Sequence, residues 1–260
     1  MTNPANVIGK VYLVGAGPGA PDLLTLRAAK ILASADIVFY DALVHPETVA
    51  LAENARKVAV GKRVGQVSTD QRFINRSLVE AARSHKVVVR LKGGDPMLFG
   101  RAQEEIAALQ AANIEVEIVP GITAALAASA QLKQSLTQRG IARSVTFATP
   151  RIGPNEAESD WQNAVENSDT AVLYMASRDS ANIAKRLIAK GKPASFPVAI
   201  VENISLPNEQ QIRMTLNELA NSVLNFDGPA VLCLGEVFAV VDTKVDAAFA
   251  SSAAQKLAQR

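Results

Sequence analysis

Short apolar runs alternate with helix-like stretches along most of the 260-residue chain, and this alternation constrains the fold more than any other feature. The first set of runs that we interpret as strands covers residues 11–14, 37–40, 58–60, 87–91 and 116–119. The first of them, residues 11–14, is apolar without interruption, which is typical of a parallel strand that helices cover on both faces. The pattern therefore predicts an α/β protein with mainly parallel sheets and helices on both faces.

A second set of apolar runs follows a polar segment at residues 131–143. We interpret these runs as strands over residues 144–148, 171–175, 198–201, 210–214 and 231–234. The chain is long enough to form two modest domains, each with its own core. We therefore expect an N-terminal α/β domain over residues 8–135, a C-terminal α/β domain over residues 136–245, and a tail over residues 246–260.

Side chains typical of helix starts precede several of the helix-like stretches. Asp22 is placed to cap the first helix, and Ser68 with Gln71 and Thr215 with Glu218 are spaced as capping boxes. In the helix after Gln71, the apolar side chains recur at helical spacing and predict one buried face. That face consists of Ile74, Leu78, Ala81 and Ala82.

Composition excludes several classes of site. The net charge is only +2 and aromatic residues make up 5% of the chain, which argues against a nucleic-acid-binding protein. Cys233 is the only cysteine, so it forms no internal disulfide and no cysteine-based zinc cluster. Because it lies within an apolar run, we expect a buried strand cysteine. Residues 1–10 have no apolar signal core and no apolar run reaches about 18 residues, so we expect a cytoplasmic protein without membrane contact.

Three glycine-containing loops follow predicted strands. They are Gly15-Ala16-Gly17-Pro18-Gly19, Gly93-Gly94-Asp95-Pro96 and Pro120-Gly121-Ile122-Thr123-Ala124. Open α/β sheets bind ligands at the carboxyl ends of their strands, so three such loops predict a ligand cleft. The first loop lacks the spacing of a dinucleotide fingerprint, and no Gly-Lys-Ser/Thr follows it, so it matches neither a nicotinamide site nor a phosphate loop.

In their order along the chain, these loops and several other motifs resemble the uroporphyrinogen-III C-methyltransferases of the S-adenosylmethionine (SAM)-dependent tetrapyrrole methylase family. The resemblance covers roughly residues 9–240. The motifs that carry it are residues 11–19, 23–26, 40–41 with 43–44, 60–63, 71 with 74–75, 90–96, 99–101 with 104–105, 120–124, 144–147, 174–175, 197–199 with 201–203, and 235–237.

The resemblance implies two α/β domains with SAM in the cleft between them, S-adenosylhomocysteine as the product, no metal, and a homodimer. The implied reaction is C-methylation of uroporphyrinogen III at C2 and C7, which gives precorrin-2 through precorrin-1 for siroheme- or cobalamin-type synthesis. By the same likeness, the cofactor-binding residues are Pro18, Gly93, Gly94, Asp95, Leu98, Thr123, Ala124, Met175 and Ile204. Other family members have a small residue at the position of Ile204, where a backbone contact would survive the change.

The resemblance also implies residues that handle the tetrapyrrole. Asp41 and Lys62 match positions proposed in the family as proton acceptor and donor, and Arg101 matches a residue that contacts the substrate and takes part in proton handling. The implied substrate-binding residues are Arg101, Glu104, Arg139 and Met175. Arginine suits this role because uroporphyrinogen carries eight carboxylates, which a guanidinium binds through paired oxygens.

Several positions on the expected substrate side depart from the family pattern: Ala42, Gln103, Gln138, Gly140, Pro150 and Arg151. Two alternatives therefore stay open. One is a sister methyltransferase that acts on a later corrin precursor, and the other is a paralogue that binds SAM or a tetrapyrrole without turnover. No fused dehydrogenase or chelatase domain is expected, so the chain would carry methylation alone.

Overall fold

The computed structural model describes residues 8–61, 71–153, 157 and 159–239. Lys62 and Ser68 therefore lie outside the described residues. Backbone contacts divide the chain into two compact units. We call residues 1–131 with 203–209 the N-terminal unit, and residues 132–202 with 210–260 the C-terminal unit.

The N-terminal unit contains a five-stranded sheet in the order β3-β2-β4-β1-β5, and every neighbouring pair in it is parallel. This arrangement confirms the parallel sheet predicted from the apolar runs. The strands are β1 (Lys10–Gly15), β2 (Ile37–Tyr40), β3 (Arg56–Ala59), β4 (Val87–Lys92) and β5 (Val116–Val119).

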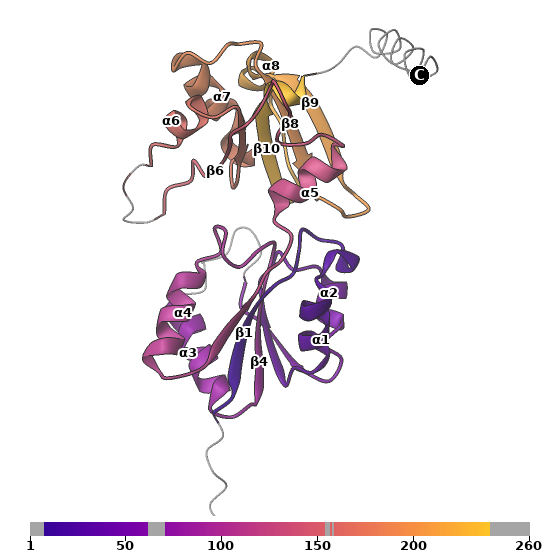
Figure 1. The fold of residues 1–260 in the computed structure, drawn as a ribbon, viewed down its shortest axis with the longest axis vertical. Coiled ribbons are helices and arrows are strands. Elements are labelled where there is room, and N and C mark those ends of the chain that lie inside the picture. Colours follow the sequence, from indigo (N-terminus) through magenta and orange to yellow (C-terminus); the bar gives the residue numbers. More distant parts are fainter. Residues whose placement is uncertain (1–7, 62–70, 154–156, 158, 240–260) are drawn as a thin grey trace, which may run out of the picture. The chain divides into compact units, whose positions relative to one another are not determined.

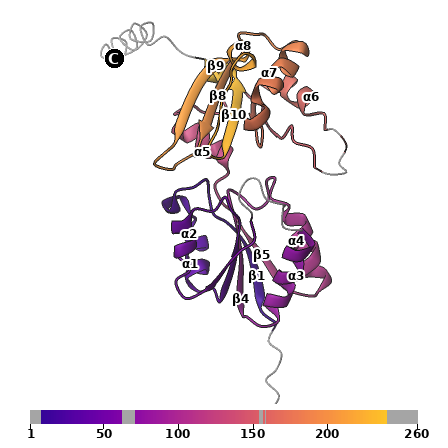
Figure 2. The same cartoon turned by 180° about the vertical axis from the view of Figure 1, so that it is seen from behind.

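Helices cover both faces of this sheet, with α1 and α2 on one face and α3 and α4 on the other (Figures 1 and 2). Side chains that alternate along each strand fill the two layers: Val11 and Leu13 pack in the core that includes α3 and α4, and Val14 packs in the core that includes α1. The buried residues of α3 are the four that the sequence predicts. The helices are α1 (Leu26–Ala33), α2 (Pro46–Ala50), α3 (Gln71–Ala82) and α4 (Ala102–Ala111), and α5 (Ala124–Gln131) follows β5.

The first helix starts later than the sequence suggests. Thr25, not Asp22, is its N-cap, and the Thr25 hydroxyl accepts a hydrogen bond from the Ala28 amide at 3.1 Å. Asp22 lies instead in a short 3₁₀ helix, Pro21–Leu23, so its prediction as the cap was wrong. The capping box of Thr215 and Glu218 at the start of α8 (Leu216–Ala220) is confirmed.

The C-terminal unit contains a second five-stranded sheet, in the order β6-β7-β10-β8-β9. Only β6 and β7 run parallel, and the other three pairs are antiparallel. The expectation of a mainly parallel sheet is wrong here for two reasons. Residues 203–209 join β8 to β9 as a hairpin, which is too short for a parallel crossover, and β10 lies between β7 and β8 and runs antiparallel to both. The strands are β6 (Val145–Ala148), β7 (Thr170–Leu173), β8 (Pro197–Glu202), β9 (Gln210–Thr215) and β10 (Ala230–Gly235).

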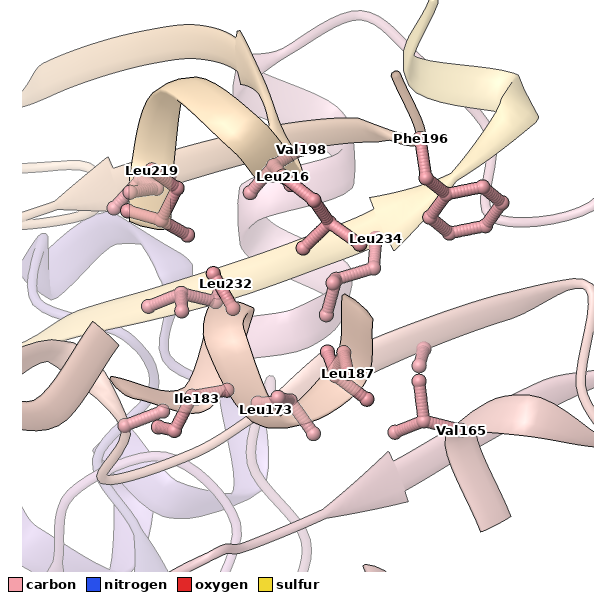
Figure 3. Packing of buried hydrophobic residues seen from close by; sticks show 14 of the residues in the cluster. Val165, Leu173, Ile183, Leu187, Phe196, Val198, Leu216, Leu219, Leu232 and Leu234 are labelled. Atoms are coloured by element: carbon pink, nitrogen blue, oxygen red, sulfur yellow. The ribbon is translucent and has the colours of Figure 1, made fainter. Parts of the chain in front are cut away.

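One face of the second sheet is packed by α6 (Trp161–Glu166), α7 (Ser180–Ala189) and α8. Figure 3 shows Leu232 and Leu234 of β10 within this layer, near Leu187 of α7. Cys233 lies between these two leucines in the strand and is fully buried, as predicted. Burial raises the pKa of its thiol to about 12. Within the described residues, none of the helices combines the length and apolarity that a membrane-spanning helix requires.

Candidate active site

The three glycine loops follow β1, β4 and β5, which are adjacent in the first sheet. Parallel neighbours end at the same edge, so the loops meet there. Gly17 and Gly94 form an isolated antiparallel bridge, in which the Gly94 amide donates to the Gly17 carbonyl at 2.7 Å and the Gly17 amide donates to the Gly94 carbonyl at 3.2 Å. The first and second loops are therefore joined by backbone hydrogen bonds.

The third loop approaches the other two closely enough to require glycine. A Cβ atom on Gly121 would lie 2.3 Å from the Gly94 carbonyl oxygen, and a Cβ atom on Gly15 would lie 2.6 Å from the Gly121 Cα. Both distances are shorter than real Cβ contacts, and the obstructing atoms belong to the backbone. Gly15, Gly94 and Gly121 together form what we call the glycine contact.

Asp95 fixes the same edge with its side chain. One carboxylate oxygen accepts a hydrogen bond from the Met97 amide at 2.8 Å, and the other accepts from the Gly121 amide at 2.9 Å. The sequence predicts Asp95 as a cofactor ligand, and in the structure it also ties the second loop to the third. An ionised carboxylate has more than two acceptor positions, so its hydrogen bonds to the backbone leave room for a ligand donor.

The other predicted cofactor residues of this unit gather around the same loops. Gly93 and Gly94 are half-buried, and a Cβ on Gly94 would meet only the Thr123 Cα, at 4.0 Å. The space beside Gly94 is therefore open and is bordered by the third loop, where Thr123 leads into Ala124 of α5. Pro18 lies in the first loop, and Leu98 is partly buried in the segment after Asp95.

Residues 203–209 attach to the first loop. The Ala20 amide donates to the Ser205 hydroxyl at 3.0 Å, and a Cβ on Gly19 would lie 2.8 Å from the Ile204 carbonyl oxygen. The Ile204 side chain is itself buried, so the first loop meets the backbone of this residue.

A network of four charged residues, which we call the ionic network, lies beneath this edge. Arg90 donates from Nη2 to Asp41 at 2.5 Å and from Nε to Glu105 at 3.0 Å. Lys92 donates to both oxygens of Glu105, at 3.1 and 3.0 Å, and Gln71 donates to Glu105 at 3.2 Å. Two cations thus share two carboxylates, and only Asp41 has an appreciably exposed side chain, at 28%.

The charges of the network hold each other in place. Burial lowers the pKa of Lys92, the neighbouring Arg90 guanidinium lowers it further, and Glu105 opposes both effects. Burial also acts to lower the pKa of Arg90, but Asp41 and Glu105 outweigh it and the pKa rises. Sequence reasoning missed the roles of Lys92 and Glu105. The available signal was that Arg90 and Lys92, two residues apart on a buried strand, face the same side and need carboxylate partners.

Arg101 and Glu104 form an exposed pair at the start of α4. Arg101 donates from Nε and Nη2 to the two oxygens of Glu104, at 2.7 and 2.9 Å. Their side chains are 57% and 49% exposed, and Arg101 has left-handed backbone with φ 54°. The guanidinium is therefore accessible, with Glu104 beside it as the sequence predicts.

Arg139 and Met175 belong to the C-terminal unit. Arg139 is exposed in a turn closed by hydrogen bonds between Gln138 and Ala142, at 2.9 and 2.8 Å. Met175 follows β7, is 47% exposed and has a positive φ of 55°. The N-terminal unit thus contains the predicted residues of the three loops and, in addition, Asp41, Arg101 and Glu104. Arg139 and Met175 belong to the C-terminal unit.

A family model described as Tetrapyrrole (Corrin/Porphyrin) Methylases matches residues 10–220. The chain belongs to the tetrapyrrole methylases. This membership confirms the resemblance drawn from the loop motifs, and the fold described above is that of the family.

Curated relatives of this tetrapyrrole methylase include siroheme synthases. The one from Actinobacillus pleuropneumoniae serotype 7 is 43% identical over 238 residues, which is 91% of this chain and 49% of the relative. The one from Zymomonas mobilis is 42% identical over 230 residues, 88% of this chain and 49% of the relative. The chain thus spans about half the length of the curated relatives it matches.

Two solved structures of similar proteins align with this chain over nearly the full length of the solved chains. Uroporphyrin-III C-methyl transferase from Thermus thermophilus, in complex with S-adenyl homocysteine, is 40% identical with a TM-score of 0.78, over 88% of this chain and 98% of that chain. A cobalt precorrin-4 methyltransferase is 26% identical with a TM-score of 0.77, over 91% of this chain and 99% of that chain.

Gly121→Ala tests the glycine contact. Because the new Cβ would collide with backbone, we expect the substitution to lower the free energy of unfolding by about 2–3 kcal/mol in urea titrations. Gly93→Ala is the matched control, since its Cβ would lie 3.1 Å from the Cβ of Leu43 and in ordinary contact with the Leu43 backbone, at 3.7 and 3.8 Å. A few tenths of an ångström of movement at the exposed Leu43 would relieve this contact, so we expect a loss of about 1 kcal/mol for the control. Equal losses for the two variants would contradict the glycine contact.

Glu105→Gln tests the ionic network. The substitution leaves Lys92 and Arg90 buried with one carboxylate fewer, so we expect the free energy of unfolding to fall by about 3–5 kcal/mol. Glu104→Gln, one residue earlier on the same helix, removes only an exposed pair and should cost at most about 1 kcal/mol. Urea unfolding of both variants measures the difference, and a small loss for Glu105→Gln would show that the network carries little buried charge.

Proposed function

We propose that this protein is a SAM-dependent uroporphyrinogen-III C-methyltransferase that methylates C2 and C7 and releases precorrin-2, with precorrin-1 as the intermediate. The similarity to the Thermus enzyme over almost all of that enzyme's length carries this assignment. The siroheme synthase relatives support a place in siroheme- or cobalamin-type synthesis. The chain matches about half the length of those relatives, and methyl transfer is the activity that we propose for the matched part.

The residues at the sheet edge fit SAM. The space beside Gly94 is open, glycine backbone lines it, and Thr123 borders it. Leu98 and Pro18 offer apolar surface, and Asp95 offers an acceptor for an amine or hydroxyl. In our assignment these residues, with Gly93, Ala124, Met175 and the backbone of Ile204, hold the cofactor. When bound, SAM supplies a methyl group on a positively charged sulfonium, so the protein needs no covalent nucleophile.

The chain's own residues then have two tasks, alignment of the acceptor carbon and removal of a proton. We assign proton acceptance to Asp41, whose Oδ1 is bound by Arg90 and whose Oδ2 has no hydrogen-bond partner among the described residues. Lys62, outside the described residues, is assigned proton donation from the resemblance. Asp41 lies directly after β2, at the same sheet edge as the glycine loops.

Substrate carboxylates require cations that solvent can reach. Arg101 is accessible and its guanidinium is oriented by Glu104, and Arg139 is accessible on its turn. We assign both arginines to the carboxylates of uroporphyrinogen, with Met175 as a further contact. A cytoplasmic location and a homodimer are parts of the same proposal and follow from the family resemblance.

Anaerobic incubation of the purified protein with SAM and enzymatically generated uroporphyrinogen III tests the proposed function. Mass spectrometry of the oxidised products should show a gain of two methyl groups, because the two methyl-accepting carbons, C2 and C7, lie on two different rings. An incubation without SAM is the control. No methylation of uroporphyrinogen III, with methylation of a precorrin supplied in parallel, would contradict the assignment in favour of a sister methyltransferase.

A further inference from the structure

The ionic network has one end in contact with solvent. Side-chain exposure is 28% for Asp41, 3% for Arg90, 4% for Lys92 and 0% for Glu105. The buried members therefore stand behind Asp41, and only Asp41 can meet a ligand at the sheet edge.

Arg90 is restrained from several sides. Besides Asp41 and Glu105, it donates from Nη1 to the carbonyl oxygens of Leu91, at 3.2 Å, and Phe39, at 3.5 Å. Phe39 lies in the neighbouring strand, so the guanidinium spans β4, β2 and α4. A planar group bound at this many points has little freedom to rotate, whereas a lysine amine in its place could not reach these acceptors together.

Glu105 is anchored as firmly. It accepts from Arg90, from Lys92 and from Gln71 of α3, and Gln71 is itself bonded to Asn75 at 3.0 Å. Lys92 is buried, with 4% of its side chain exposed, and it balances the charge of Glu105.

We propose that Arg90 is the positioning residue for Asp41, and that Glu105, neutralised by Lys92, fixes Arg90 for that purpose. Arg90 holds Oδ1 of Asp41 and thereby directs Oδ2 outward, toward the reacting tetrapyrrole. This inference rests on the proposed function, which makes Asp41 the proton acceptor. A buried ion network is seldom the most stable way to fill such a space, and apolar side chains would pack there at lower cost. The buried charges are not accounted for by stability alone, whereas the positioning of Asp41 accounts for them.

A double-mutant cycle of Arg90→Lys and Asp41→Asn tests the inference. Asp41→Asn should lower kcat by about 100-fold and Arg90→Lys by about 10-fold, with the KM for SAM unchanged in both. If Arg90 acts through Asp41, the double variant should match Asp41→Asn alone, because no carboxylate is left to position. A further 10-fold loss in the double variant would overturn the inference.

Leu78→Ala is the control for damage to the fold. Leu78 is fully buried in the core that α4 packs against, but it belongs to no part of the ionic network. The kcat of the Leu78→Ala variant should therefore stay within about twofold of that of the unaltered protein. A kcat loss equal to that of Arg90→Lys would assign the effect to stability.

Crystal structures give a measurement that needs no turnover. In Arg90→Lys, the Asp41 carboxylate should leave its position or lose order, and in Leu78→Ala it should stay in place. An unmoved Asp41 in Arg90→Lys would overturn the inference even in an active enzyme. If the unaltered protein fails to methylate uroporphyrinogen III while Asp41 shifts in Arg90→Lys, the proposed function fails and the positioning of Asp41 stands.

Discussion

The contact among Gly15, Gly94 and Gly121 is the constraint on which the carboxyl edge of the first sheet depends. Three adjacent parallel strands deliver their loops to one place, and only the lack of a Cβ lets the backbones touch there. Asp95 then fixes the third loop through the Gly121 amide. The same glycines leave backbone and open space beside Gly94, so the feature that joins the loops also makes room for a ligand.

The ionic network supplies this edge with a partly exposed carboxylate, that of Asp41, which buried charges hold in place. Two cations of β4 meet Glu105 of α4 and Asp41 at the end of β2, and the exposed end of the network lies where the loops gather. Arg90 and Lys92 lie on a strand and Glu105 lies on a helix, so rigid elements hold the partners of Asp41, which itself follows directly after β2. The site thus combines a backbone cradle for a cofactor with a carboxylate whose orientation is set by buried charge.

Local patterns predicted the parts of the structure that local physics decides. Apolar runs located the strands, helical spacing located the buried face of α3 from Ile74 to Ala82, and glycines marked the loops. Strand direction in the second sheet could not be predicted in this way, because β10 pairs with strands distant in sequence. The Asp41–Arg90 and Arg90–Glu105 contacts span 49 and 15 residues, so no local spacing reveals them.

Calorimetric titration of the purified protein with S-adenosylhomocysteine tests most directly whether the glycine contact builds a cofactor site. We predict one molecule bound per chain with micromolar affinity and at least about tenfold weaker binding by Gly121→Ala. Gly140→Ala, which strains a positive φ of 81° but whose Cβ meets nothing within 4 Å, should bind as the unaltered protein does. Equal binding by both variants, or no binding by the unaltered protein, would contradict the account.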